Sequence, residues 1–242
     1  MRAAYFDVDG TIVGSNLLYP TLHYIRNQAS PVDSARRLGK LALQAPFLLM
    51  AELQDRRKFN EQLFSHFEGM TEDRLVSLAD EVFEDVFEPR IFKGARGLLD
   101  KCRDAGMRIV FVTGALDVSV APLAKHLGAD AVIANRLEMK EGKATGRLLR
   151  PVVAGPSKAR VIVEDARVHG HDLAECQAYS DSESDVPMMS VVGHPFCVNP
   201  DAGLRALARS YDWPILDLDR EAAGGRSRLR LPFGFYAPER RG

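Results

Sequence analysis

The chain has 242 residues and a mass of 26.8 kDa, the size of one large domain or of a domain with an insertion. Hydrophobic residues make up 46% of the chain and charged residues 27%, a composition that excludes a disordered protein. The net charge of −1 provides no overall field for binding a nucleic acid, so no nucleic-acid partner is expected. Three scattered cysteines and the lack of a signal sequence predict a cytoplasmic protein.

Short apolar runs typical of buried strands alternate with helical patterns along most of the chain. The strand-like runs lie at residues 3–6, 107–113, 131–134, 177–180, 196–198 and 214–218. The helical patterns between them lie at residues 95–105, 117–127, 157–168 and 202–210. Strands that alternate with helices of this length predict an α/β fold with a mostly parallel sheet, covered by helices on both faces.

One region interrupts this alternation. Helical periodicity without a convincing strand appears at residues 17–28, at 33–67 with a break expected near Pro46, and at 71–87. We therefore predict an all-helical unit at 16–88, inserted into an α/β core formed by 1–15 and 89–219.

Polar residues follow several predicted strands, at the edge of the sheet where open α/β folds bind their ligands. The relevant segments are Asp7-Val8-Asp9-Gly10-Thr11, Thr113-Gly114 and Asp181-Ser182-Glu183-Ser184-Asp185. Lys158 opens a helix after Pro156, from where its amine can reach the same edge. We expect these carboxylates, the hydroxyl and the lysine to converge on one site.

In their order along the chain, these three segments and Lys158 resemble the four motifs of the haloacid dehalogenase (HAD) superfamily. The helical insertion between the first two motifs is similar to the cap of its phosphoserine-phosphatase-like branch. The resemblance implies a Rossmann-like core with a helical cap. It also implies a Mg²⁺-dependent phosphatase that hydrolyses a small phosphorylated metabolite through an aspartyl-phosphate intermediate.

The resemblance further implies roles for the acidic residues. Asp7 would be the nucleophile, and Asp9 would protonate the leaving group and then deprotonate the attacking water. The side chains of Asp7 and Asp181 and the backbone carbonyl of Asp9 would hold Mg²⁺, which prefers oxygen ligands.

The remaining motif residues would bind the phosphoryl group or support those that do. Thr113, Gly114 and Lys158 would contact its oxygens, and Asp185 would orient Lys158 or a metal-bound water. Each motif alone has an ordinary explanation, since Asp-Gly is a common turn and a lone lysine is usually solvated. All four in order favour the catalytic interpretation.

Two other functions are consistent with these residues. One is a phosphotransferase that passes the phosphoryl group to an acceptor other than water, and the other is a non-catalytic phospho-receiver or binding module. The sequence also departs from true phosphoserine phosphatases, which usually have Asp-Ser-Thr where this chain has Asp9-Gly10-Thr11. Phosphoserine is therefore not the substrate we expect.

Two further segments bear on partners. Residues 45–50 are apolar and lie between basic clusters at 36–40 and 56–58, so we expect them in the core of the cap. As alternatives, Phe47 and Leu49 would line a pocket for an apolar leaving group, or the segment would contact a membrane or lipid head groups. Residues 220–242 form an extension with six arginines and two glutamates, suited to the domain surface or to an anionic partner.

Overall fold

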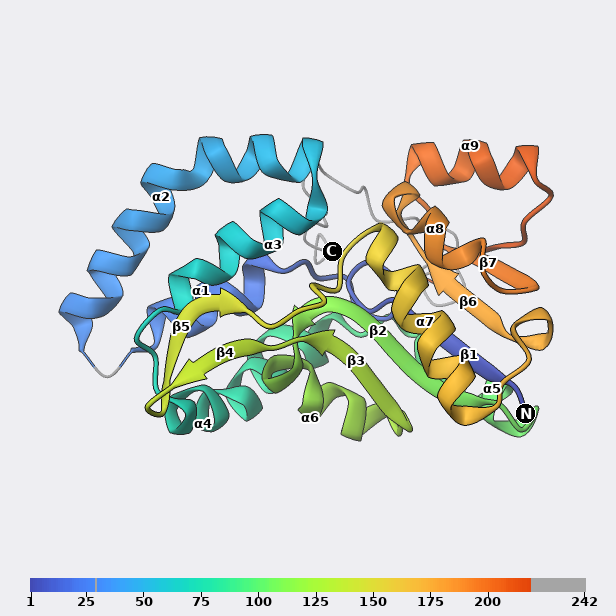
Figure 1. The fold of residues 1–242 in the computed structure, drawn as a ribbon, viewed down its shortest axis with the longest axis horizontal. Coiled ribbons are helices and arrows are strands. Elements are labelled where there is room, and N and C mark those ends of the chain that lie inside the picture. The colour runs from blue at the N-terminus through green and yellow to red at the C-terminus, as the bar shows by residue number, and fades with distance from the viewer. Residues whose placement is uncertain (29, 219–242) are drawn as a thin grey trace, which may run out of the picture.

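The fold is that of a computed structural model, which describes residues 1–28 and 30–218 (Figure 1). Within these residues six strands form one sheet in the spatial order β3-β2-β1-β6-β7-β8, and every neighbouring pair is parallel. The strands are β1 (Ala3–Phe6), β2 (Arg108–Leu116), β3 (Ala131–Asn135), β6 (Gln177–Ser180), β7 (His194–Val198) and β8 (Ile215–Leu216). The predicted parallel α/β sheet is present, and β1 lies near its centre.

Helices cover both faces of this sheet. Ala4 and Phe6 of β1 belong to a core cluster with α5 and α6, whereas Ala3 and Tyr5 belong to a second cluster with α7, α8 and α9. These helices are α5 (Ala95–Asp104), α6 (Asp117–Leu127), α7 (Pro156–His169), α8 (Val186–Met189) and α9 (Ala202–Ser210). All four residues of β1 are fully buried, which explains why this strand is apolar without alternation.

Residues 16–90, which precede α5 in the chain, form a helical layer, which we call the lid. Its helices are α1 (Leu18–Arg26), α2 (Pro31–Gln54), α3 (Arg56–Phe64) and α4 (Glu72–Val82). Shorter helical turns follow at Ser65–Phe67, Phe83–Phe87 and Glu88–Arg90. Buried side chains such as Tyr24, Leu63 and Leu78 form the lid interior, which is continuous with one of the two sheet cores.

A hairpin ties the lid to the core. Strands β4 (Leu137–Lys140) and β5 (Lys143–Leu148) pair antiparallel as a separate two-stranded sheet. The amide of Gly69 donates to the carbonyl of Ala144 at 2.8 Å, and the amide of Ala144 donates to the carbonyl of Met70 at 2.8 Å. The lid is therefore attached to the core by this contact as well as by its two chain connections.

The helix break expected near Pro46 is wrong. Helix α2 continues through Pro46 to Gln54, although it bends along its length in Figure 1. Proline removes only one backbone donor, and Pro46 lies on the exposed side of the helix, where water can bind the freed carbonyl. The helix instead ends at Asp55, whose carboxylate accepts from the amides of Arg57 at 2.8 Å and Lys58 at 3.4 Å and so starts α3.

Three further features concern the cysteines, a possible membrane span and the C-terminal extension. Cys102, Cys176 and Cys197 are buried and free of disulfides. Among the helices described, none has the length and apolar character needed to cross a bilayer. The basic extension predicted at 220–242 lies outside the described residues.

Candidate active site

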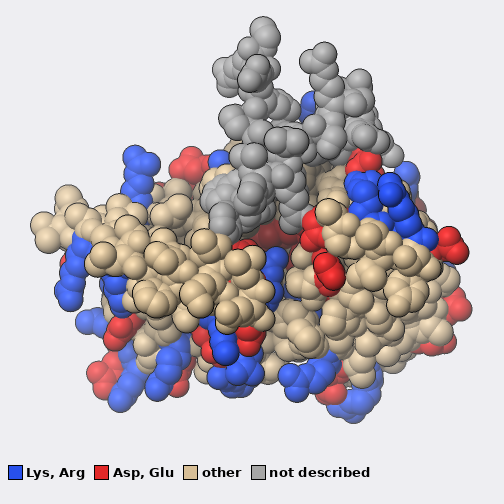
Figure 2. Space-filling model, turned by 90° about the horizontal axis from the view of Figure 1, so that it is seen from above, with Lys and Arg blue, Asp and Glu red and all other residues tan. Residues whose placement is uncertain are grey.

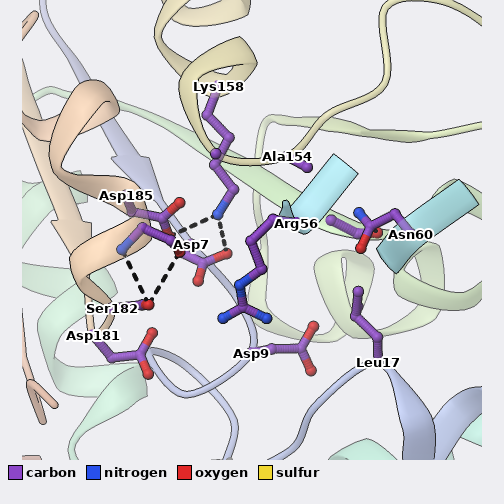
Figure 3. Close-up of a pocket in the computed structure, with 13 residues that line it drawn as sticks. Asp7, Asp9, Leu17, Arg56, Asn60, Ala154, Lys158, Asp181, Ser182 and Asp185 are labelled. Atoms are coloured by element: carbon purple, nitrogen blue, oxygen red, sulfur yellow. Dashed lines mark hydrogen bonds and ion pairs between the residues drawn. The ribbon is translucent and has the colours of Figure 1, made fainter. Parts of the chain in front are cut away.

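A cavity of about 60 Å³ lies at the carboxyl ends of the central strands, below the lid (Figure 3). Its lining from the core comprises Asp7, Asp9, Gly114, Ala154, Gly155, Lys158, Asp181, Ser182, Ser184 and Asp185, and its lining from the lid comprises Leu17, Arg56 and Asn60. Six of the seven predicted site residues therefore meet at one cavity, with Thr113 as the exception.

A buried lysine joins two of the carboxylates. The amine of Lys158 lies 2.8 Å from Oδ1 of Asp7 and 2.8 Å from Oδ2 of Asp185, and the three side chains are 6%, 8% and 4% exposed, respectively. Ser180 Oγ also donates to Oδ2 of Asp185, at 2.7 Å. Burial alone would lower the pKa of Lys158, but the two carboxylates raise it further than burial lowers it, so the amine stays protonated.

The electrostatic balance at Asp7 is different. Burial raises the pKa of Asp7 well above its usual value, and the adjacent Lys158 acts in the opposite direction. The negative charges of Asp185 and Asp181 raise it further. The site thus holds more carboxylate than its one buried lysine can neutralise.

The start of α7 positions Lys158. Gly155 has φ of +47°, and Pro156 follows as the first helical residue. The hydroxyl of Ser157 accepts from the amide of Ala154 at 2.9 Å. This turn places Lys158 in the first turn of α7, with its side chain directed at the end of β1 (Figure 3).

The turn after Asp9 depends on Gly10. Its amide donates to the carbonyl of Val13 at 2.7 Å, and its φ is +84°. A Cβ on Gly10 would lie 2.1 Å from Oδ2 of Asp181, so any side chain here would displace the Asp181 carboxylate. Thr11 then donates from Oγ1 to Oδ1 of Asp181 at 3.2 Å. The Asp-Gly-Thr order therefore makes room for Asp181 and fixes its carboxylate.

The carboxylate of Asp9 differs from that of Asp7 in its hydrogen bonding and in its pKa. Both of its oxygens are shielded from solvent and have no hydrogen-bond partner among the described residues. Burial raises the pKa of Asp9 to about 7, with Lys158 lowering it, Asp181 raising it and Arg56 lowering it. A carboxyl group with this pKa can donate and accept a proton near neutral pH.

The donor set around the cavity fits Mg²⁺. The carboxylates of Asp7 and Asp181 line it together, and the unpartnered carboxylate of Asp9 adds buried oxygens. In the described part of the chain, no three histidine, cysteine or acidic side chains cluster tightly enough to form a complete ligand set by themselves. Mg²⁺ usually takes one or two carboxylates and keeps several waters, so this oxygen-only set suits it.

The structure places the second motif differently from the sequence-based expectation. Strand β2 does not end at Thr113 but continues to Leu116. Thr113 is fully buried, and its Oγ accepts from the amide of Ala115 at 3.0 Å rather than facing the cavity lining. Gly114 does line the cavity, whereas the phosphate contact of Thr113 stays a prediction.

Two asparagines at this motif were not predicted. The side-chain amide of Asn60 donates to the carbonyls of Gly114 and Val153 at 3.3 and 3.4 Å. That of Asn135 donates to the same two carbonyls at 2.8 and 3.1 Å and accepts from the amide of Val153 at 2.8 Å. Asn60 thereby connects α3 of the lid to the core. Its place between Phe59 and the buried Leu63 on an apolar helix face was the available sequence signal.

Arg56 is the second lid residue that the sequence did not single out. It is the first residue of α3, and Figure 3 shows its guanidinium directed into the cavity on the side of Asp9. Glu52 holds it through an ion pair of 3.1 Å. Three consecutive basic residues follow Asp55, and the sequence does not indicate which of them enters the cavity.

The apolar residues 45–50 behave differently from the first expectation. Leu48 is buried, but Phe47 is 66% and Leu49 is 37% exposed, so the segment is not simply the core of the lid. Neither Phe47 nor Leu49 lines the cavity, which also argues against the leaving-group pocket.

The chain is similar to proteins of a known hydrolase family. The family model for haloacid dehalogenase-like hydrolases matches residues 4–190. The chain is 35% identical over 228 residues to phosphoserine phosphatase SerB1 of Mycobacterium tuberculosis, covering 91% of this chain and 73% of that protein.

Two solved structures are similar as well. A protein of unknown function from Bordetella pertussis superposes with a TM-score of 0.76 at 26% identity, covering 90% of this chain and 98% of that one. A substrate-bound phosphoserine phosphatase superposes with a TM-score of 0.63 at 20% identity, covering 90% and 94%. The fold class predicted from the sequence is thereby confirmed.

Proposed function

This chain belongs to the haloacid dehalogenase-like hydrolases, an enzyme family, and it resembles phosphatases within it; from this premise we propose a Mg²⁺-dependent phosphomonoester hydrolase that forms a phosphoryl-aspartate on Asp7. The observation that carries the proposal is the pair of carboxylates, Asp7 and Asp9, at the end of a central strand. Only Asp7 has a cation, Lys158, within 2.8 Å. The two groups therefore suit different tasks.

The proposed reaction has two steps. The Asp7 carboxylate attacks the phosphorus, the bond from phosphorus to the leaving oxygen breaks, and Asp9 gives that oxygen its proton. A water then attacks the phosphorus of the phosphoryl-aspartate, Asp9 takes its proton, and Asp7 and inorganic phosphate are released. Both proton transfers suit the raised pKa of Asp9, which is about 7.

The other residues would offset the negative charge of the phosphoryl group and of Asp7. The Lys158 ammonium would lie against the oxygens on which negative charge develops, while Asp185 keeps it in place. Mg²⁺, when bound by the Asp7 and Asp181 side chains and the Asp9 carbonyl, supplies positive charge that offsets the repulsion between Asp7 and a phosphate dianion.

The lid limits the substrate. A cavity of about 60 Å³ suits a small phosphate ester, and we propose that the lid moves to admit it. Among the described residues, its contribution to the lining is one cation, Arg56, one amide, Asn60, and one apolar side chain, Leu17, without an acidic residue. This set suits a small phosphate ester with a second anionic group better than one with an ammonium group. Action on such metabolites in the cytoplasm is part of the proposal.

The test uses an aryl phosphate with Mg²⁺. Asp7→Asn should abolish release of both the phenol and phosphate, whereas the matched surface variant Asp104→Asn should keep normal turnover. Near-normal turnover by Asp7→Asn would disprove the proposed nucleophile. In the wild type, phenol and inorganic phosphate should appear in equal amounts, because an excess of phenol would instead indicate transfer to another acceptor.

Substrate preference is tested separately. Phosphoglycolate carries a carboxylate without an ammonium group, and phosphoserine carries both. We expect a higher kcat/KM for phosphoglycolate, and a preference for phosphoserine would contradict the assignment of the lid lining.

A further inference from the structure

Helix α2 presents an apolar surface to solvent. Leu43, Phe47, Met50 and Leu53 are 80%, 66%, 56% and 79% exposed. Their spacing of three or four residues places them along one side of the helix, and we call this row the lid stripe. Exposed apolar residues are ordinary when they are scattered, but four in one row form a continuous surface.

The lid stripe faces away from the protein. The buried residues of α2 are Ser34, Leu41, Leu48 and Ala51, which lie on the opposite side of the helix. Figure 1 shows α2 at the periphery of the molecule, and the view from above in Figure 2 shows a broad tan area over this part of the lid. Packing within the described chain therefore does not account for these side chains.

Both ends of the stripe are basic. Arg36 and Lys40 are exposed before it, and Arg57 and Lys58 are exposed after it. Between Asp33 and Glu52 the helix has no acidic residue. After the stripe, Glu52 is paired with Arg56 and Glu61 with Arg57, so the positive charge is greater before the stripe than after it. The surface thus combines an apolar centre with basic side chains at both ends.

This charge distribution disfavours a second copy of the chain as the occupant. If two stripes packed together, either parallel or antiparallel, a basic end of one would meet a basic end of the other. Like charges in contact oppose such pairing. A partner with a negative surface and an apolar interior satisfies both parts of the stripe.

We propose that the lid stripe docks the enzyme on the surface of an anionic lipid bilayer. The apolar side chains would enter the boundary between head groups and acyl chains, while Arg36, Lys40, Arg57 and Lys58 contact lipid phosphates. The inference rests on the outer face of α2 and is independent of the proposed chemistry. It places the bilayer at the helix whose end leads directly into Arg56 of the cavity.

The test is co-sedimentation of the full chain with vesicles. Vesicles of phosphatidylcholine with phosphatidylglycerol should bind the protein, and vesicles of phosphatidylcholine alone should bind it at least about tenfold more weakly, since each basic residue contributes about fivefold on an anionic surface. The triple variant Leu43→Gln, Phe47→Gln, Met50→Gln should lose at least about tenfold in binding, because burial of one such side chain alone is worth roughly that.

Matched controls separate the stripe from general surface effects. Val76 of α4 and Val168 of α7 are 59% and 61% exposed, and Val76→Gln and Val168→Gln should bind vesicles like the wild type. Arg36→Gln with Lys40→Gln should weaken binding to anionic vesicles, whereas Lys125→Gln on α6 should not. All variants should hydrolyse a soluble aryl phosphate normally, which verifies that they fold.

A spectroscopic variant tests insertion directly. Phe47→Trp should shift its fluorescence to shorter wavelength on anionic vesicles, and Val76→Trp should not. The proposal is overturned if the wild type binds neither vesicle type at low salt, or if the triple variant binds like the wild type. It is also overturned if the wild type is a dimer that the triple variant converts to monomer, because a second copy would then cover the stripe.

Discussion

The two sides of the cavity hold their polar groups in different ways. On the core side, charged groups are fixed by other charged or hydroxyl groups: Lys158 lies between Asp7 and Asp185, and Thr11 donates to Asp181. On the lid side, Arg56 depends on a helix start and one ion pair, and Asn60 on two long amide contacts. The polar groups of the core are therefore held in one geometry, whereas those of the lid depend on contacts that can be replaced by others.

This difference indicates which side sets the chemistry and which sets the choice of substrate. Changes in the core should affect every phosphate ester and also stability. Changes in the lid should affect substrates unequally and leave stability nearly unchanged.

The largest effect is expected from Lys158→Met. It leaves Asp7 and Asp185 buried without their cation, which costs about 3–5 kcal/mol of unfolding free energy near neutral pH. Activity should fall by at least about a thousandfold on all substrates, since the charge that stabilises the transition state is lost. Urea unfolding and steady-state kinetics measure both, with the exposed Lys101→Met as control. Retained stability would mean that the ion pairs contribute little.

A second test concerns Asp9 and pH. Its pKa is about 7 in the folded protein and near 3.8 when unfolded, so the folded state binds the extra proton between these values. The contribution of Asp9 to the stability of the metal-free protein should therefore fall as pH rises from about 4 to 7 and then level off, by at most about 4 kcal/mol. Asp9→Asn should remove this part of the decline and leave the part that the raised pKa of Asp7 produces, so the variant should be more stable than the wild type near pH 8 and equal near pH 4. Parallel profiles in urea unfolding with a chelator present would contradict the assignment.

A third test uses two glycines with similar backbones. Gly10 and Gly142 have φ of +84° and +71°, but only Gly10 has a carboxylate where a Cβ would lie. Both alanine variants should lose about 1 kcal/mol from backbone strain. Gly10→Ala should in addition lower kcat by about a hundredfold or more, because Asp181 is displaced and Mg²⁺ binding weakens. Equal activity of the two variants would show that the carboxylate position is not critical.

The smallest effect is expected from the lid. Arg56→Gln should reduce kcat/KM about fivefold for phosphoglycolate, because an exposed ion pair with the carboxylate contributes roughly 1 kcal/mol. It should change turnover of a neutral aryl ester much less, and unfolding in urea should be unaffected. Arg57→Gln, at the adjacent residue, which pairs with Glu61 and does not line the cavity, is the control. A uniform loss on all substrates would indicate that Arg56, like the core residues, contributes to the reaction itself and not to the choice of substrate.

The core was largely predictable from the sequence because its determinants are local. The run Ala3–Phe6 is apolar throughout and followed by polar residues, so its strand and the position of Asp7 follow directly. The continuation of β2 past Thr113 was not predictable, because Gly114 interrupts the apolar pattern and the strand is extended by pairing of Leu116 with Asn135.

The lid was less predictable because its determinants are contacts between distant segments. The roles of Asn60 and Arg56 depend on carbonyls and acids contributed by other parts of the fold, and the local sequence indicates only that Asn60 lies on an apolar helix face. The exposure of Phe47 was also missed, since an apolar run in a helix ordinarily indicates a core. The helix break predicted near Pro46 was wrong because a proline on the solvent side of a helix bends it without ending it.

The strand order has a consequence for how the enzyme forms in the cell. Ala4 of β1 pairs with Ile109 on one side and with Gln177 on the other, so the central strand has neighbours that are far away in the chain. A ribosome adds about 5–20 residues per second, so β1 waits on the order of ten seconds or more for its second neighbour. During that time an apolar strand with at least one open edge is exposed to other nascent chains. Production of this protein should therefore depend on chaperones and on slow expression more than its modest size suggests.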